Sequence, residues 1–193
     1  MTTPGLYPVF LRLANLPVVL VGGGPVAASK LDGLLAAGAI VTVVAPVVCE
    51  AIRARATEGI AIVARAFEPS DLDGARWVVA AAPPEVDRAV AVAAAERGLF
   101  VNAVDDVASA SAYLGGVVRR GEITIAISTG GAAPALAGLL REALDALLPA
   151  DLARWVETAR AARIEWRRAG VPMAERRPKL LRALDALYAK AAS

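Results

Sequence analysis

The sequence contains no histidine, so it lacks the commonest general base and the commonest transition-metal ligand. Acid–base chemistry must then rely on Asp, Glu, Lys, Tyr or Cys. The single cysteine, Cys49, excludes an internal disulfide and is typical of a reducing compartment. No permanent metal site is expected from this set of side chains.

Long apolar runs and aromatic residues are also scarce. Aromatic residues make up 5% of the chain, and no apolar run reaches the roughly 18 residues of a membrane span. The first residues show no signal-peptide pattern. The pI is near 9.0, but no nucleic-acid-binding signature accompanies it. We therefore expect a cytoplasmic protein that binds neither membranes nor nucleic acid.

The first half alternates short β-branched runs with helical patterns, which indicates a parallel sheet covered on both faces. Strands are expected at 16–21, 40–45, 60–65, 77–82 and 100–104, and helices at 27–37, 50–58 and 85–97. This order predicts an α/β fold of the Rossmann-like type.

After Asp106 the pattern changes. A hairpin is expected from strands at 116–119 and 122–128. The residues Thr129, Gly130 and Gly131 then lead into a helix that ends at Leu147, and two further helices are expected at 151–168 and 172–192. The chain is thus predicted to contain a nucleotide-binding domain (1–112), a hairpin–helix segment (113–148) and a small helical C-terminal domain (149–193).

The glycine turn after the first strand reads G-x-G-x-x-A, from Gly22 through Gly23 and Gly24 to Ala27. Glycines there permit a tight turn and close approach of a pyrophosphate, and Ala27 permits close packing of helix and strand. Pro25 and Val26 complete the motif before the helix expected at 27–37, whose free N–H groups at its N-terminus favour an anion. The alternative is a glycine-rich turn without a ligand, but the strand–turn–helix context favours a dinucleotide.

The second strand ends in Ala45 and Pro46, where an acid commonly binds the ribose of NAD. No arginine stands there to indicate NADP, and Arg53 is expected on the next helix. Sequence rules alone therefore leave the choice between NAD and NADP open. Ala82 and Val104, at the ends of later strands, are expected to complete the cofactor site.

Asp105 follows the last parallel strand, where an acid would face the working end of the cofactor. A turn aspartate is the competing interpretation, and it is favoured for Asp106. Ser128, Thr129 and Gly130 lie between a strand and a helix, where they would either surround an anion or cap the helix. No Tyr-x-x-x-Lys pair is present, and Cys49 is interpreted as structural or incidental.

At this point the sequence resembles the precorrin-2 dehydrogenases of sirohaem synthesis, which also form the N-terminal part of larger sirohaem synthases. The matching stretches follow one another over nearly the whole chain: 7–10, 21–27 with Lys30, 41–46, 102–105, 127–131 with Pro134, 139–142 and 173–177. The chain departs from the family pattern at Pro83, Pro84, Asp87, Ala133 and Gly138.

The resemblance implies oxidation of precorrin-2 to sirohydrochlorin with NAD, and in some members iron insertion as well. It assigns catalysis to Asp105, which is one of the few bases available without histidine. The substrate carries many carboxylates, which arginine matches with a bidentate fork. The substrate-binding candidates are Asn102, Ser128, Thr129, Gly130, Arg119, Arg120, Arg141, Arg176 and Arg177.

The resemblance also implies an intertwined homodimer in which the middle segment, about 113–148, exchanges between protomers. The alternative hypothesis is a nucleotide-sensing Rossmann module with a dimerising tail and no catalysis. That hypothesis does not explain why the sequence contains the motifs at 102–105, 128–131 and 175–177. A chelatase without oxidation is disfavoured because the glycine turn is intact.

Overall fold

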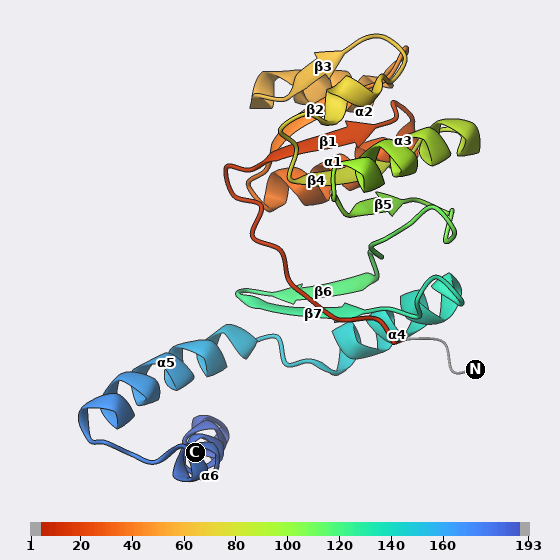
Figure 1. Cartoon of the computed structure of the whole chain (residues 1–193). Coiled ribbons are helices and arrows are strands. Elements are labelled where there is room, and N and C mark those ends of the chain that lie inside the picture. Colours follow the sequence, from red (N-terminus) through yellow and green to blue (C-terminus); the bar gives the residue numbers. More distant parts are fainter. Residues whose placement is uncertain (1–4, 190–193) are drawn as a thin grey trace. The chain divides into compact units, whose positions relative to one another are not determined.

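The computed structural model describes residues 5–189 and divides after Leu114 into two compact units (Figure 1). The division differs by two residues from the predicted end of the nucleotide-binding domain. A further boundary near residue 148 stays a prediction. Each unit is described by itself.

The first unit contains a five-stranded parallel sheet in the order β3-β2-β1-β4-β5. The strands are β1 (Pro17–Val21), β2 (Ile40–Val44), β3 (Ala61–Val63), β4 (Trp77–Ala80) and β5 (Val101–Ala103). The helices are α1 (Pro25–Ala36), α2 (Glu50–Ala54) and α3 (Pro84–Glu96), with 3-10 turns η1 (Arg55–Glu58) and η2 (Pro69–Leu72). The Rossmann-like prediction is confirmed.

Both faces of the sheet are covered because the central strands are apolar on both sides. On one face, Leu20 and Val43 pack with Leu31 of α1 and Ile52 of α2. On the other face, β1, β4 and β5 pack against the α3 residues Val90, Ala93 and Ala94. Ala27 is fully buried at the start of α1, as expected for close packing of helix on strand.

The second unit begins with an antiparallel hairpin of β6 (Gly116–Arg120) and β7 (Ile123–Ile127). It continues with α4 (Pro134–Leu147), α5 (Leu152–Arg168) and α6 (Met173–Ala189). The residues expected to lead into this helix form a turn, in which Gly130 and Gly131 have left-handed φ angles of 64° and 79°, and α4 begins at Pro134. The last predicted helix extends to residue 192, and its final residues lie outside those described.

Two predicted elements of the first unit are interrupted. The helix expected at 50–58 is α2 followed by the 3-10 turn η1, which Gly59 ends with a left-handed φ of 83°. The strand expected at 60–65 is paired only over Ala61–Val63. Arg65 lies beyond the last paired residue and turns toward η2, where it forms an ion pair with Asp71.

Candidate functional site: the carboxyl edge of the parallel sheet

The glycine turn between β1 and α1 is shaped by close backbone contacts. A Cβ atom at Gly22 would overlap the carbonyl oxygen of Ala81, and one at Gly23 would overlap that of Val47. Gly22 also has a left-handed φ of 131°. Glycine is therefore required at both positions by the neighbouring loops of the protein itself.

Gly24 differs, because a Cβ there would meet nothing within 4 Å. It is the N-cap of α1, without a side-chain cap, and the first turn of α1 contains no acidic residue. The positive end of the helix dipole therefore faces open space without a competing carboxylate. These features fit the pyrophosphate of a dinucleotide, which Gly24, Pro25 and Val26 would hold.

The other residues expected to touch the cofactor follow strands that end at this same edge. The Gly22 N–H donates to Val44 O at 3.0 Å, and the Ala81 N–H donates to Val21 O at 2.8 Å. The Val104 N–H donates to Ala80 O at 2.9 Å. These bonds join the glycine turn to the ends of β2, β4 and β5, which lead into Ala45, Pro46, Ala82 and Val104.

Asp105 is an exposed carboxylate just beyond β5, with a left-handed φ of 60°. Aspartate tolerates this conformation better than most residues, although non-glycine residues rarely adopt it. Asp106 has a different role. It accepts hydrogen bonds from the N–H groups of Ala108 and Ser109 and from the Ser109 hydroxyl, which lower the pKa of its carboxyl. The prediction that Asp106 is a turn residue is confirmed.

Asn102 lies in β5 with its side chain in the interior, 6% exposed. Its Nδ2 donates to Ala112 O at 3.0 Å, which ties the segment after Asp105 to the sheet. Its Oδ1 is buried and has no hydrogen-bond partner among the described residues. Contact between Asn102 and substrate stays a prediction.

Asp87 is a residue of this edge that the sequence analysis left without a role. It is 2% exposed in the first turn of α3, and its Oδ1 accepts a hydrogen bond from the Ala82 N–H at 3.0 Å. Burial raises the pKa of Asp87 from 3.8 to about 6; the Ala82 N–H opposes this rise, and the charges of Asp106 and Glu85 add to it. The sequence contains one signal for this burial: Asp87 is three and seven residues from Val90 and Ala94, and this spacing puts all three on the helix face that packs on the sheet.

In the second unit, the predicted Ser-Thr-Gly turn hydrogen-bonds to itself. The Ser128 hydroxyl accepts the Gly130 N–H at 3.1 Å, and the Thr129 hydroxyl accepts the Ala133 N–H at 3.2 Å, one residue before α4. Both hydroxyls retain an O–H that is able to donate. The N-cap of α4 is Ala133, without a side-chain cap, so these hydroxyls stabilise the turn and do not cap the helix. The role of the turn toward an anion stays a prediction.

The five candidate arginines fall into two groups. Arg120 forms a 2.8 Å ion pair with Asp145, the Nε of Arg176 donates to Val171 O at 3.0 Å, and Arg141 pairs with its neighbour Glu142. Arg119 and Arg177 are exposed, and no ion pair joins either to another described residue. They are the two candidates free to bind an anionic ligand.

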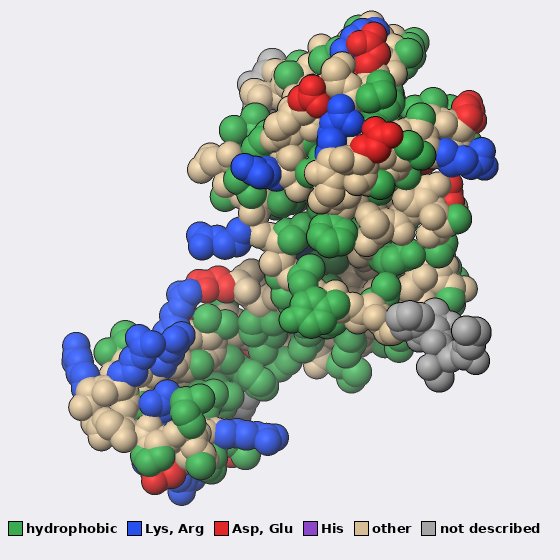
Figure 2. All heavy atoms as spheres, in the orientation of Figure 1, with side chains coloured by type: hydrophobic (Ala, Val, Ile, Leu, Met, Phe, Trp, Pro, Cys, Tyr) green, Lys and Arg blue, Asp and Glu red, His purple; other side chains and the backbone are tan. Residues whose placement is uncertain are grey.

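Charge is divided unequally between the units. The second unit holds 13 of the 21 Lys and Arg residues but 8 of the 19 Asp and Glu residues. Figure 2 shows Lys and Arg side chains gathered over α5 and α6. Such a surface attracts anionic ligands. Among residues 5–189, no group of three or more Cys, Asp or Glu side chains is arranged to hold a metal ion, and no helix is long and apolar enough to cross a membrane.

Comparison with known proteins identifies the families to which the two parts of the chain are similar. Residues 9–116 match the family described as "Putative NAD(P)-binding". The chain belongs to this NAD(P)-binding family. Residues 120–147 match the central part of sirohaem biosynthesis proteins. The resemblance to the precorrin-2 dehydrogenase family noted from the motifs is confirmed.

Individual relatives agree with this assignment. The chain is 43% identical over 182 residues to siroheme synthase 1 of Aeromonas salmonicida, covering 93% of this chain but 39% of that protein. It is 43% identical over 154 residues to siroheme synthase 1 of Pectobacterium atrosepticum, covering 79% of this chain and 32% of that protein. The chain thus spans about two fifths or less of these relatives.

One solved structure matches nearly the whole chain. It is described as SirC, precorrin-2 dehydrogenase, with a TM-score of 0.73 and 26% identity. The match covers 92% of this chain and 88% of that chain. The likeness therefore includes both units as well as the nucleotide-binding fold.

Proposed function

We propose that the chain is a precorrin-2 dehydrogenase, which oxidises precorrin-2 to sirohydrochlorin with NAD. The observation that supports this most is the match to SirC over both units, combined with an exposed Asp105 at the same carboxyl edge of the sheet as the glycine turn. The basic second unit is suited to a polycarboxylate. The single cysteine of the chain, Cys49, supports a reducing, cytoplasmic setting.

In this proposal each group at the edge has a defined task. Gly24, Pro25 and Val26 hold the pyrophosphate at the start of α1. When bound, NAD supplies the acceptor for the hydride that leaves the macrocycle. Asp105, in its carboxylate form, accepts the proton that the macrocycle loses. Its left-handed backbone directs a charged side chain from the end of β5, where a base is needed and no histidine exists.

The same carboxylate makes iron insertion the second activity to test, because insertion also requires removal of pyrrole protons. Sirohaem synthases are the curated relatives of the chain, and their product contains iron. No resident metal is involved in this proposal, since iron would be a substrate. A homodimer with an exchanged middle segment, residues 113–148, completes the proposed assembly.

The experiment compares Asp105→Asn with Asp106→Asn under the same conditions, with precorrin-2 and NAD. Both replacements remove one negative charge from the loop after β5. Asp105→Asn is expected to slow sirohydrochlorin formation by about a hundredfold, while NADH binding is unchanged. Asp106→Asn is expected to stay within about threefold of the wild type. Normal turnover by Asp105→Asn would contradict the assignment of the base.

A cofactor-sensing module without catalysis predicts a different outcome. It would bind NADH tightly and form no sirohydrochlorin from precorrin-2 in any variant. Iron insertion is measured separately, by giving sirohydrochlorin and Fe²⁺ to the protein without NAD. Sirohaem formation that depends on Asp105 would support the second activity, and formation at the protein-free rate would contradict it.

A further inference from the structure

A charged cluster lies at the end of β3, beside the position where the usual ribose-binding acid is missing. The Ala45 N–H donates to Val63 O at 3.2 Å, and the Arg65 N–H donates to the same oxygen at 3.0 Å. Neighbouring strands lie about 4.8 Å apart. Arg65 is therefore one strand away from Ala45, at the same carboxyl edge as the glycine turn.

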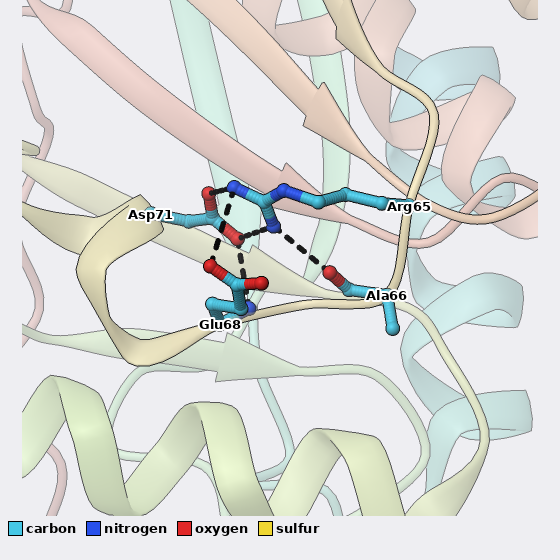
Figure 3. A network of polar contacts seen from close by, with 4 residues as sticks. All are labelled: Arg65, Ala66, Glu68 and Asp71. Atoms are coloured by element: carbon cyan, nitrogen blue, oxygen red, sulfur yellow. Dashed lines mark hydrogen bonds and ion pairs between the residues drawn. The ribbon is translucent and has the colours of Figure 1, made fainter.

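The guanidinium of Arg65 is paired with carboxylates within this cluster (Figure 3). Its two terminal nitrogens donate to Asp71 at 2.9 and 2.6 Å, and one of them also donates to Ala66 O at 2.9 Å. The second terminal nitrogen lies 3.8 Å from a Glu68 carboxylate oxygen. Asp71 therefore occupies the end-on fork, formed by the two terminal nitrogens of the guanidinium.

The cluster carries one positive and two negative charges. The Asp71 side chain is 8% exposed, and its Oδ2 also accepts the Glu68 N–H at 2.8 Å. The Arg65 hydrogen bonds lower the pKa of the Asp71 carboxyl, so it stays ionised at neutral pH. Arg53, the basic residue nearest in sequence to the end of β2, lies 3.7 Å from Glu50 in an ion pair.

We propose that the cluster of Arg65, Glu68 and Asp71 makes the adenosine end of the cofactor site selective for NAD over NADP. This rests on the proposed function, because it concerns the same cofactor site. NADP carries an additional 2′-phosphate, which would meet a net negative charge and an arginine whose end-on fork is already bound to Asp71. NAD carries a neutral hydroxyl there. The cluster thus provides, from β3 and η2, the discrimination that an acid at the end of β2 provides elsewhere.

Direct binding titrations with NADH and NADPH test this without any need for turnover. The wild type is expected to bind NADH at least about tenfold more tightly. Glu68→Gln removes one exposed negative charge and keeps the side-chain shape, so it should lower the ratio of the Kd for NADPH to the Kd for NADH about threefold. Asp71→Ala also frees the end-on fork of Arg65, so it should lower this ratio about tenfold.

The gain in NADPH binding by Asp71→Ala must depend on Arg65. The double variant Arg65→Gln with Asp71→Ala is therefore expected to lose that gain. Asp73→Ala is the matched control: it breaks a 3.0 Å ion pair with Arg97, but Asp73 precedes β4 and so lies toward the amino edge of the sheet. It should leave the ratio unchanged.

Equal binding of NADH and NADPH by the wild type would overturn the proposal. So would an unchanged ratio in both Glu68→Gln and Asp71→Ala. If Asp71→Ala fails to fold, Glu68→Gln alone decides, because Glu68 is exposed. Preference for NADH with no oxidation of precorrin-2 would contradict the proposed function but support this inference.

Discussion

The backbone N–H of Ala82 donates a hydrogen bond to the buried carboxylate of Asp87, at 3.0 Å. Ala82 follows Ala81, whose carbonyl oxygen limits the space at Gly22. The carboxylate of α3 therefore fixes the loop that borders the glycine turn. The cost of this arrangement is a buried charge, which burial makes harder to ionise.

The first prediction follows from that charge. Asp87 has a pKa of about 6 in the folded protein and 3.8 as its ordinary value, so folding favours its protonated form. The wild type is therefore stabilised by protonation as pH falls from about 6 toward 4, and ionised Asp87 destabilises it above that window. Asp87→Asn keeps the acceptor for Ala82 without the charge, and should raise the unfolding free energy at pH 8 by about 1–3 kcal/mol.

The difference in unfolding free energy between Asp87→Asn and the wild type should disappear near pH 4, which urea denaturation at several pH values would measure.

Asp71→Asn is the opposite case, because the pKa of Asp71 is lowered in the folded state. Its stabilising charge is present at neutral pH and is lost on acidification, so Asp71→Asn should be destabilised at pH 8. Equal pH dependence in the two variants would contradict both assignments.

The second prediction separates the glycines of the turn. Gly24→Val adds a side chain where the structure is open, so the protein should fold with an unchanged melting temperature. The new side chain would occupy the proposed pyrophosphate position, and NADH binding should weaken by at least about tenfold. Gly33→Ala, in α1 and also in open space, is the control that should bind NADH normally. Normal NADH binding by Gly24→Val would refute the cofactor position.

The third prediction concerns the arginines of the second unit. Arg119→Ala and Arg177→Ala should raise the KM for precorrin-2 several-fold without changing the melting temperature, because both side chains are exposed and unpaired among the described residues. Arg120→Ala removes the ion pair with Asp145, so it should lower the melting temperature instead. Thermal denaturation and steady-state kinetics on the same preparations separate the two effects. A KM unchanged by Arg119→Ala and Arg177→Ala would argue against their role.

The fourth prediction concerns α4, which presents an uncovered apolar stripe. Leu136, Leu139, Leu140 and Leu147 are 48%, 63%, 42% and 77% exposed, while Ala137 of the same helix is buried. An apolar stripe of this kind is typical of a surface that a second protomer covers. Leu139→Glu should therefore convert a dimer to monomers in light scattering after gel filtration. Glu142→Gln is the control on α4, and a monomeric wild type would exclude the proposed dimer.

Much of the fold was predictable because local signals agreed with one another. The β-branched runs before Gly22 and before Pro46 mark strands, and glycines mark the ends of helices. The less accurate boundaries lie where backbone geometry overrides the apolar pattern. The helix expected through residue 58, for example, ends at Ala54 and continues as the 3-10 turn η1.

The site was less predictable, because burial and pairing depend on tertiary contacts. An acid in the first turn of a helix usually stabilises the helix dipole from the surface, so Asp87 attracted no special interpretation. Its spacing from Val90 and Ala94 indicates the face that packs on the sheet, and the structure shows that the carboxylate on this face is buried. The pairing of Arg65 with Asp71 likewise requires the turn at η2. Asp105 and Asp106 are adjacent in sequence, and the hydrogen bonds of Asp106 distinguish them.

The most direct test of the account follows both products of one reaction. Purified protein is given precorrin-2 and NAD without oxygen, and sirohydrochlorin and NADH are measured together. We predict that the two products appear at equal rates and in equal amounts, and only when NAD and enzyme are both present. Sirohydrochlorin formed without matching NADH, or no conversion with either NAD or NADP, would contradict it.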